Sequence, residues 1–215
     1  MNAFVAILGR DLRLSLGSGG IGLPVVFFLL VATLYPFAVG PDGALLAKTG
    51  GGVLWVAALL AALLPIDRLI APDAEAGVLD QYAVRGVGEE MIAAAKITAH
   101  WIGFGPPLML AAIPASAMLR LDGETLAAVE LGLLAGTPGL AALGVMVASL
   151  TAGLRRGGAL AGLLMLPLAI PLIIFGAGSI GDFGGGALRF LAASSLFLVA
   201  VATFAAGAGI RALRE

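Results

Sequence analysis

Long stretches without any charged residue limit the fold of this chain more than any other feature. Six of them follow one another along the sequence, at 14–41, 49–66, 97–119, 131–154, 157–181 and 190–210. A helix needs roughly 20 apolar residues to cross the hydrocarbon core of a bilayer, which is about 30 Å thick. Each stretch reaches or approaches that length, so the sequence predicts six transmembrane helices.

Composition agrees with a membrane protein and excludes several other classes. Charged residues make up 12% of the 215 residues, whereas a soluble domain carries about 25%. Cysteine is absent, which excludes disulfides, iron–sulfur clusters and thiolate metal sites. A net charge of −1 gives no electrostatic reason to expect nucleic acid as a partner.

The predicted fold class is all-α. Membrane β-strands would alternate apolar and polar residues over about ten positions, but the six stretches are apolar throughout. Helices satisfy their own backbone hydrogen bonds in lipid, so they are the remaining solution. Only one connector is long, and we therefore expect residues 1–215 to form a single transmembrane domain.

Basic residues predict the orientation, because Lys and Arg concentrate in cytoplasmic loops. With a cytoplasmic N-terminus, one side of the membrane holds nine of the 12 basic residues and the other holds three. The nine are Arg10, Arg13, Arg68, Arg85, Lys96, Arg155, Arg156, Arg211 and Arg214, and the three are Lys48, Arg120 and Arg189. This asymmetry and the even number of spans predict that both termini are cytoplasmic.

Residues 1–16 precede the first span and carry an apolar stripe at helical spacing. The stripe consists of Phe4, Ile7, Leu8, Leu12 and Leu16. Arg10, Asp11 and Arg13 lie off it. This pattern predicts an interfacial amphipathic helix on the cytoplasmic leaflet. The alternative is that these residues simply extend the first span.

The longest polar stretch, residues 67–96, joins the second and third spans. Pro72 and Asp73 are typical of a helix start, and Glu75 falls in the first turn, where the helix dipole favours acid. An apolar edge beside two polar residues follows, formed by Val78, Leu79 and Tyr82 beside Asp80 and Gln81. Residues 72–90 thus favour a short cytoplasmic helix that docks on a partner, and a solvated connector is the alternative.

Ionisable groups that could do chemistry are nearly absent from the predicted spans, so we expect no catalytic residue and no metal site. His100, beside Trp101 near the cytoplasmic end of the third span, is the main exception. A lone histidine does not build a proton relay or a metal site by itself. The pair fits either an axial ligand to haem or an interfacial pair hydrogen-bonded at the level of the lipid headgroups.

Nucleotide binding and ion coupling are not predicted for this chain. Residues 43–49 resemble a phosphate-binding loop, but Ala47 occupies the position of its second glycine. Glu130 is the one carboxylate within reach of a coupling role, and snorkelling or pairing with Arg120 explains it. We therefore expect no enzyme activity in this chain and an energy source in a partner.

Seven segments, taken in order, carry a resemblance to a known family. They are Thr33–Phe37 with Gly40 and Pro41, Gly52–Leu60, Gly77–Gln81, Ala95 and Lys96 with Ala99–Trp101, Gly136–Leu140, Gly153–Gly158 and Leu166–Phe175. Together they resemble the permease subunit of the cytochrome c maturation ABC transporter, the haem exporter protein B family known as CcmB. The resemblance covers nearly the whole chain and implies an ABC-2-like permease.

This resemblance also implies partners and a location. The permease would work in the bacterial inner membrane with an ATP-binding cassette subunit, a haem-handling membrane protein and a small single-span subunit. A haem chaperone would depend on the complex indirectly. The complex would hold two permease copies, or one permease and a related subunit. The chain would bind no cofactor alone, with ATP on the partner and haem as a candidate substrate.

The implied function is to couple ATP hydrolysis by the partner to haem delivery and to release of a haem-loaded chaperone in c-type cytochrome biogenesis. The alternative is a scaffold that moves no substrate and transmits ATPase motion to a haem-handling partner. The expected docking residues are Asp73, Glu75, Gly77, Val78, Leu79, Asp80, Gln81, Tyr82, Arg155 and Arg156. His100 and Trp101 are the candidates for contact with haem.

Overall fold

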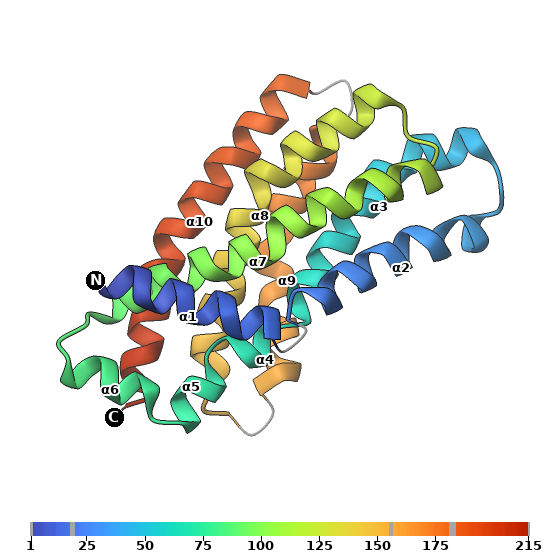
Figure 1. Ribbon diagram of the computed structural model, residues 1–215. Helices are drawn as coiled ribbons and strands as arrows, with labels where there is room; N and C mark the ends of the chain where they lie inside the picture. The colour runs from blue at the N-terminus through green and yellow to red at the C-terminus, as the bar shows by residue number, and fades with distance from the viewer. Residues whose placement is uncertain (1, 18–19, 155–156, 181–183, 215) are drawn as a thin grey trace.

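The computed structural model describes residues 2–17, 20–154, 157–180 and 184–214, and the regular structure in these ranges is helical (Figure 1). Six of the described helices are long and apolar enough to cross a membrane. They are α2 (Gly22–Val39), α3 (Gly43–Leu63), α7 (Glu89–Met118), α8 (Gly123–Thr151), α9 (Gly157–Gly178) and α10 (Gly184–Ala212). The prediction of an all-α protein with six spanning helices is confirmed.

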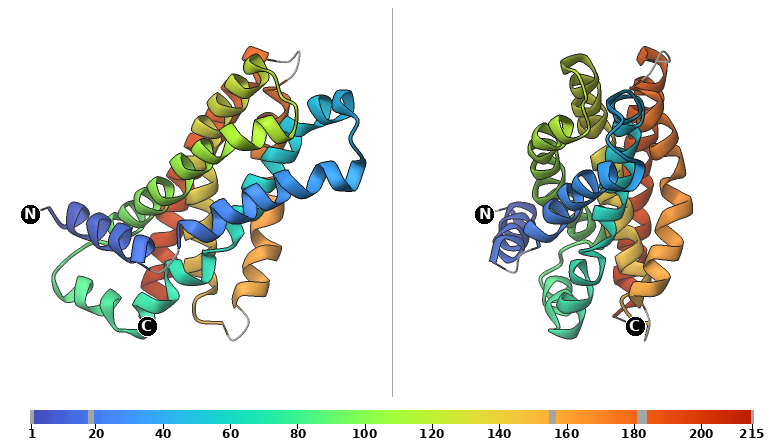
Figure 2. Two further views of the ribbon diagram at one scale, coloured as in Figure 1. Left: turned by 45° about the vertical axis from the view of Figure 1, so that its right-hand side comes forward. Right: turned by 90° about the vertical axis from the view of Figure 1, so that its right-hand side faces the viewer.

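Helix α8 is the centre of the bundle. It packs against α3, α7, α9 and α10 (Figures 1 and 2). In its most apolar stretch 78% of the residues are buried within the protein, against 17% in α2 and 28% in α9. The core is therefore built around α8, while α2 and α9 turn most of their apolar side chains outward, as lipid-facing helices do.

A tryptophan from α3 fills the space between α8 and α9. Trp55 is fully buried, and its ring occupies the room that side chains at Gly132, Gly136 and Gly176 would need. A Cβ atom at Gly136 would come within 2.5 Å of the indole ring. Small residues usually let membrane helices approach each other closely. Here they admit one bulky side chain into the middle of the bundle.

The spanning helices begin at different residues from the charge-free stretches. α3 begins at Gly43 behind Asp42, whose carboxylate accepts hydrogen bonds from backbone amides of the first turn. α8 begins at Gly123 behind Asp122, which accepts a hydrogen bond of 2.8 Å from the Thr125 amide. Charged residues beside the spans therefore cap helices or belong to their end turns, rather than marking where the helices stop.

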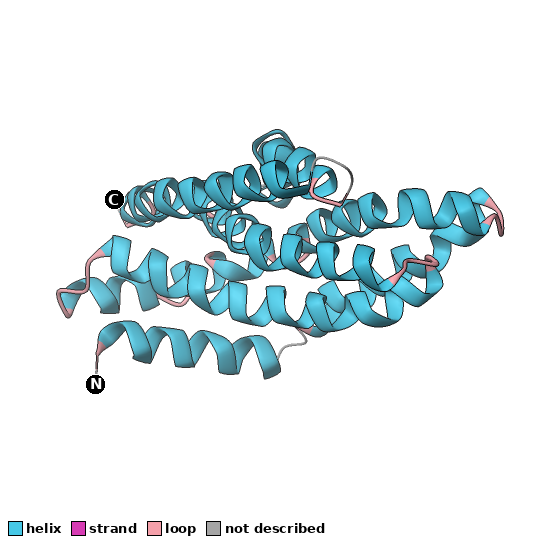
Figure 3. Ribbon diagram, turned by 90° about the horizontal axis from the view of Figure 1, so that it is seen from above, coloured by secondary structure: helices cyan, strands magenta, loops and turns pink. Residues whose placement is uncertain are grey.

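The first helix is separate from the first span. α1 (Ala3–Gly17) ends before α2 begins at Gly22 (Figure 3), and α1 packs along α7 (Figure 1). The stretch 14–41 thus contains the end of α1 as well as α2. Ile7 from the apolar stripe of α1 is buried in the protein, whereas Leu16 is 69% exposed. Residues 3–17 thus form a helix of their own, and its location at the membrane interface stays a prediction.

Three short helices connect α3 to α7. They are α4 (Ile66–Leu69), α5 (Ala71–Glu75) and α6 (Val78–Val84). Residues 72–90 therefore contain parts of two short helices where the sequence predicts one, because Gly77 adopts a left-handed conformation with φ of 67° between α5 and α6. Glycine takes this conformation without the steric cost that a Cβ atom would impose.

The end of α10 lies beside α6 and the start of α7 (Figure 1). Arg214 pairs with Glu89 at 2.6 Å, and its Nε lies 3.6 Å from Asp80. Arg211 lies 3.3 Å from Glu90. These ion pairs join the last turn of α10 to both helices at one end of the bundle.

Candidate functional site

Lys96 is the centre of a buried ion-pair network where α1, α4 and α5 meet α7. Its side chain is 4% exposed. Its Nζ donates hydrogen bonds to Asp11 Oδ2 at 2.9 Å, to Asp73 Oδ2 at 2.5 Å and to the Leu69 carbonyl oxygen at 3.1 Å. An ammonium group has three donors, so this one side chain uses all of them to hold α1, α5 and the end of α4 against α7.

Arg10 completes the network from α1. Its Nη1 and Nη2 donate to the two carboxylate oxygens of Asp73 at 3.0 and 2.5 Å, and Nη1 also donates to Asp11 at 3.0 Å. Bidentate guanidinium–carboxylate pairs are strong and fix the relative orientation of their partners. Two cations and two carboxylates balance, so the four side chains bring no net charge into the protein.

The pKa of Asp73 reflects opposed effects. Burial favours the neutral acid and acts to raise the pKa, but the hydrogen bond from Arg10 and the charge of Lys96 together outweigh it. The pKa of Asp73 therefore lies below its ordinary value. The same hydrogen bond raises the pKa of Arg10 above its ordinary value. Asp73 is ionised at neutral pH, and the network depends on that charge.

The length of α7 places this network at the membrane surface. Residues 89–96 rise about 12 Å along the helix axis, at about 1.5 Å per residue. Residues 97–118 rise about 33 Å, which is enough to cross a hydrocarbon core of about 30 Å. α7 is thus long enough to cross the hydrocarbon core with residues 97–118 and to keep the turns up to Lys96 outside it.

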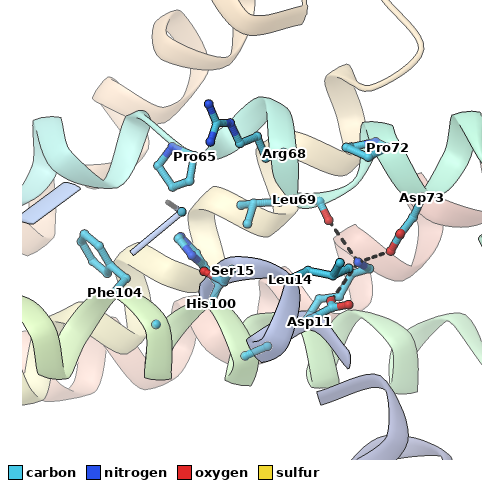
Figure 4. A pocket seen from close by; sticks show the side chains of 14 residues that line it. Asp11, Leu14, Ser15, Pro65, Arg68, Leu69, Pro72, Asp73, His100 and Phe104 are labelled. Atoms are coloured by element: carbon cyan, nitrogen blue, oxygen red, sulfur yellow. Dashed lines mark hydrogen bonds and ion pairs between the residues drawn. The ribbon is translucent and has the colours of Figure 1, made fainter. Parts of the chain in front are cut away.

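A cavity of about 290 Å³ opens beside the network, between α1, α4, α5 and α7 (Figure 4). The charged groups of Asp11, Asp73 and Lys96 form one end of it, and His100 and Phe104 form the other. Side chains from α1 and α4 provide the walls between them, among them Leu14, Ser15, Pro65 and Arg68. The volume is at the lower end of the range for small-molecule sites.

His100 is the polar side chain at the apolar end of the cavity. Its ring stacks on Phe104, with the ring centroids 5.6 Å apart and an angle of 25° between the planes. Its Nε2 atom is buried and has no hydrogen-bond partner among the described residues. Nearly all buried polar atoms in proteins have such a partner. The imidazole therefore has a nitrogen that the protein itself does not use.

Trp101, which the sequence places next to His100, belongs to a different contact. Its indole Nε1 donates a hydrogen bond of 3.1 Å to Thr137 Oγ1 on α8. Adjacent residues point about 100° apart around a helix, and Trp101 is not among the residues that line the cavity. The structure thus does not bring the two side chains into one site, and Trp101 serves the packing of α7 on α8.

The predicted docking segment contains buried as well as exposed residues. Asp73 and Leu79 are only 6% and 2% exposed. Asp73 is taken up by the ion-pair network, and Leu79 joins the hydrophobic core, which Tyr82 also contacts. The apolar edge predicted for a partner therefore faces the protein itself. Among the remaining predicted residues, Gly77 and Val78 are partly buried, and Glu75, Asp80 and Gln81 are exposed.

The exposed surface of this segment includes two residues that sequence reasoning missed. Val84 is 90% exposed and Arg85 is exposed beside it. They follow Asp80 and Gln81 by four positions each, so all four residues share one side of the helix. We call these four residues the outer face of α6. The sequence does contain a hint of this face, because Val84 follows Asp80 by four positions and the two therefore lie on the same side of a helix.

Other predicted positions lie apart from the cavity. Arg155 and Arg156 fall outside the described residues. Glu130 on α8 has a buried Oε1 without a hydrogen-bond partner, and the described ion pairs include none between Glu130 and Arg120. Among the described residues no group of three or more His, Cys, Asp or Glu side chains is arranged to hold a metal ion.

The fold and the site define a multi-pass helical membrane protein with a polar segment anchored by ion pairs at one end of the bundle. The family model for CcmB protein matches residues 2–213, and the chain belongs to that family. Proteins named heme exporter protein B are similar to it. The one from Paracoccus denitrificans is 46% identical over 212 residues, which are 96% of this chain and 97% of the relative. The one from Rhodobacter capsulatus is 45% identical over 212 residues, which are 96% of this chain and 97% of the relative. The one from Escherichia coli strain K12 is 36% identical over 173 residues, which are 80% of this chain and 79% of the relative.

Proposed function

We propose that this protein is the permease subunit of an ABC transporter complex in c-type cytochrome biogenesis. It couples ATP hydrolysis by a partner subunit to haem delivery and to release of a haem-loaded chaperone. The relatives named heme exporter protein B support haem as the substrate. The observation that carries the proposal is the anchoring of the α4–α6 segment to the spanning helices at both of its ends.

This anchoring provides a route for mechanical force. At one end of the segment, Asp73 is bonded to Arg10 of α1 and Lys96 of α7. At the other end, Arg214, two residues after the end of α10, lies 3.6 Å from Asp80 of α6. A push on the outer face of α6 is therefore transmitted to α1, α7 and α10 together, through contacts that have a defined geometry.

The central helix is reached by the same route. α4, which begins the segment, packs against α8 and α9. The Leu69 carbonyl at its end accepts the hydrogen bond from Lys96, so α4 moves with α5 and α7. A movement that a partner imposes on α4, α5 and α6 thus spreads to five other helices. They are α1, α7, α8, α9 and α10, and α8 lies at their centre.

The partners follow from this arrangement. The ATP-binding cassette subunit docks on the outer face of α6. The apolar surfaces of α2, α9 and α10 face lipid, a second permease copy or a related subunit, the haem-handling membrane protein and the small single-span subunit. The excess of basic residues at the α4–α6 end supports an orientation with both termini in the cytoplasm of a bacterium and the spans in the inner membrane.

A second candidate function is a scaffold that transmits ATPase motion to a haem-handling neighbour without moving haem itself. One observation favours it. Trp55 is fully buried, and its ring lies so close to Gly136 and Gly176 that an added Cβ atom would overlap it. Among the described residues, this bulky side chain fills the region where the central helix is most buried.

Co-expression with the ATP-binding subunit of the same system tests the docking. We expect the double variant Gln81→Arg, Val84→Asp to reach the membrane but to lose co-purification with the ATPase. Leu45→Asp is the matched control, because Leu45 is 38% exposed on the first turn of α3, far along the chain from the segment. Unchanged co-purification of the double variant would contradict docking on this face.

Reconstitution of the complex into vesicles separates the two functions. ATP-dependent movement of haem across the bilayer supports the permease. ATPase activity that remains intact without such movement supports the scaffold. Both functions require ATPase docking, so the co-purification experiment applies to either of them.

A further inference from the structure

We propose that α8 contains a hinge at residues 137–139, and that Ser195 of α10 holds this hinge in its present conformation. Pro138 lies near the middle of this 29-residue helix, which is the most buried of the six described spans. The hinge deepens the proposed function, because it is the place where the central helix bends when the α4–α6 segment moves. It rests on that function for the source of the movement, and the hinge itself is tested without a partner.

Pro138 weakens α8 in the middle of the bundle. A proline has no amide N–H, so the carbonyl of Leu134, one turn earlier, lacks the donor that an α-helix normally supplies. The proline ring also crowds that carbonyl, and prolines inside helices are therefore a usual site of kinks. The two halves of α8 are thus less firmly connected at Pro138 than in an unbroken helix.

The residues on both sides of Pro138 also use their polar groups in ways that favour a bend. Thr137 Oγ1 donates a hydrogen bond of 2.7 Å to the Leu133 carbonyl oxygen. Such bonds from a threonine to the carbonyl four residues earlier often bend helices. The Gly139 amide donates a hydrogen bond of 2.8 Å to Ser195 Oγ, which belongs to another helix. Three consecutive residues therefore contribute to one flexible turn.

Ser195 is the contact that stabilises the present conformation of this turn. Its side chain is buried, and a Cβ atom at Gly139 would lie only 2.9 Å from Ser195 Cα. A buried amide that loses its acceptor is costly, so the hydroxyl favours the conformation in which it accepts the Gly139 bond. From α7, Trp101 Nε1 donates a hydrogen bond of 3.1 Å to Thr137 Oγ1. The turn is thus held by both α10 and α7.

The two halves of α8 contact different parts of the protein. Before the hinge, a Cβ atom at Gly136 would overlap the ring of Trp55 from α3. After the hinge, a Cβ atom at Gly144 would lie 3.7 Å from Leu69 Cδ1 at the end of α4. A movement of the α4–α6 segment therefore reaches the second half of α8 directly. The hinge allows this half to move while the half beside Trp55 stays packed.

Distances between spin labels test the hinge in the purified permease alone. The chain contains no cysteine, so cysteine pairs can be introduced for labelling. Three exposed leucines are suitable: Leu131 before the hinge, Leu150 in the last turn of α8, and Leu45 in the first turn of α3 as the reference. Residues 139–150 rise about 17 Å, so a change of about 20° in the kink displaces the far end of α8 by about 6 Å.

Loss of the Ser195 hydroxyl should release the hinge. We expect Ser195→Ala to broaden the Leu45–Leu150 distance distribution and to shift it by several ångströms, while the Leu45–Leu131 distribution stays the same. Ser194→Ala is the matched control from the adjacent position, and both distributions should remain those of the unaltered protein. Singly labelled samples identify any distances that arise between copies.

Removal of the proline should have the opposite effect. Pro138→Ala restores an amide N–H to the helix, and in the Ser195→Ala background it should return the Leu45–Leu150 distribution to a narrow one. Pro167→Ala is the matched control, because Pro167 is an exposed proline inside α9. In the Ser195→Ala background this control should leave the broad distribution unchanged.

The complex with the ATP-binding subunit connects the hinge to the proposed function. A non-hydrolysable ATP analogue should shift the Leu45–Leu150 distance in the unaltered complex and leave the Leu45–Leu131 distance unchanged. In Pro138→Ala this shift should be lost. ATP-dependent haem delivery should then fall several-fold, while co-purification with the ATPase is retained.

Three results would overturn the proposal. They are an unchanged Leu45–Leu150 distribution in Ser195→Ala, equal changes at Leu131 and Leu150, and a broad distribution that persists after Pro138→Ala. Failure of the unaltered permease to co-purify with the ATPase would instead contradict the proposed function. The measurements on the permease alone do not depend on that partner, so failure of the hinge is distinguishable from failure of the proposed function.

Discussion

Lys96 of α7 and Asp73 of α5 are in direct contact, with 2.5 Å between the ammonium nitrogen and a carboxylate oxygen. Both side chains are buried, at 4% and 9% exposed. Moving two such charges out of water is costly, and their mutual attraction offsets the cost only while both are present. This contact is the most buried of the ion pairs that hold the docking segment on the spanning helices, beside the pair between Arg10 and Asp73.

Loss of the Lys96 charge should therefore destabilise the protein strongly. We expect Lys96→Met to lower the free energy of unfolding by about 3 to 5 kcal/mol, because two carboxylates then share only Arg10. Unfolding of the purified protein in mixed micelles by added denaturing detergent measures the change. Lys48→Met is the control, because Lys48 is exposed, and such surface changes usually stay within about 0.5 kcal/mol.

A double-mutant cycle shows whether this loss arises from the pair itself. Residues that interact directly show coupling of roughly 0.5 to 3 kcal/mol. Asp73→Asn should cost much less in the Lys96→Met background than in the unaltered protein. Equal costs in both backgrounds would mean that the two side chains contribute independently, and the network would then not be the connection described above.

The network should also fail in acid. The pKa of Asp73 is lower in the folded protein than its ordinary value. A depressed pKa contributes stability that is fully present above the unfolded value, near 4, and is lost as the pH falls through the folded value. We expect the difference in unfolding free energy between the unaltered protein and Asp73→Asn to shrink as the pH falls from 7 to 3.

Detergent-unfolding curves recorded along this pH series measure the effect. Glu75→Gln changes an exposed carboxylate in the same helix, and should differ from the unaltered protein by no more than about 0.5 kcal/mol throughout. A difference for Asp73→Asn that stays constant down to pH 3 would show that ionisation of Asp73 does not stabilise the fold.

The spans could be predicted because lipid imposes a simple rule on sequence. A chain that crosses a bilayer needs about 20 apolar residues each time, and the spacing of charges reports this directly. The exact ends could not be predicted, because residues such as Asp42 and Asp122 cap helices while Lys96 is buried inside one. Whether a charge ends a helix depends on the partner that it finds in the folded protein.

The site was less accessible to sequence reasoning for the same reason. His100 could be singled out as the lone histidine of the chain, but nothing local indicates that α1 and α5 come to lie beside it. The spacing of Leu79 with Val78 and Tyr82 predicts that it lies on an apolar edge for a partner. Gly77 then breaks the helix and Leu79 packs into the core. Local periodicity identifies an apolar residue, and tertiary contacts decide which surface it meets.

The packing around Trp55 gives a prediction about two glycines of the same helix. A Cβ atom at Gly176 would overlap the indole ring, whereas one at Gly162 would meet nothing within 4 Å. We expect Gly176→Ala to destabilise the protein by about 1 to 3 kcal/mol through overpacking. Gly162→Ala should be neutral or slightly stabilising, since alanine favours helix more than glycine. Equal effects of the two changes, measured by detergent unfolding, would contradict the placement of Trp55.

The last prediction concerns the ion pairs between α10 and the docking segment. Arg214 is 25% exposed and pairs with Glu89 and Asp80. Pairs that are open to solvent contribute only about 0 to 1 kcal/mol to stability, so Arg214→Ala should fold and should still co-purify with the ATPase. Without this contact, α6 loses its direct connection to the end of α10. We therefore expect ATP-dependent haem delivery to fall several-fold while ATPase docking is retained. Arg189→Ala is the control, because it alters an exposed arginine at the other end of α10, and it should leave delivery unchanged. Full delivery in Arg214→Ala would show that α10 is not part of the route from the docking segment to the bundle.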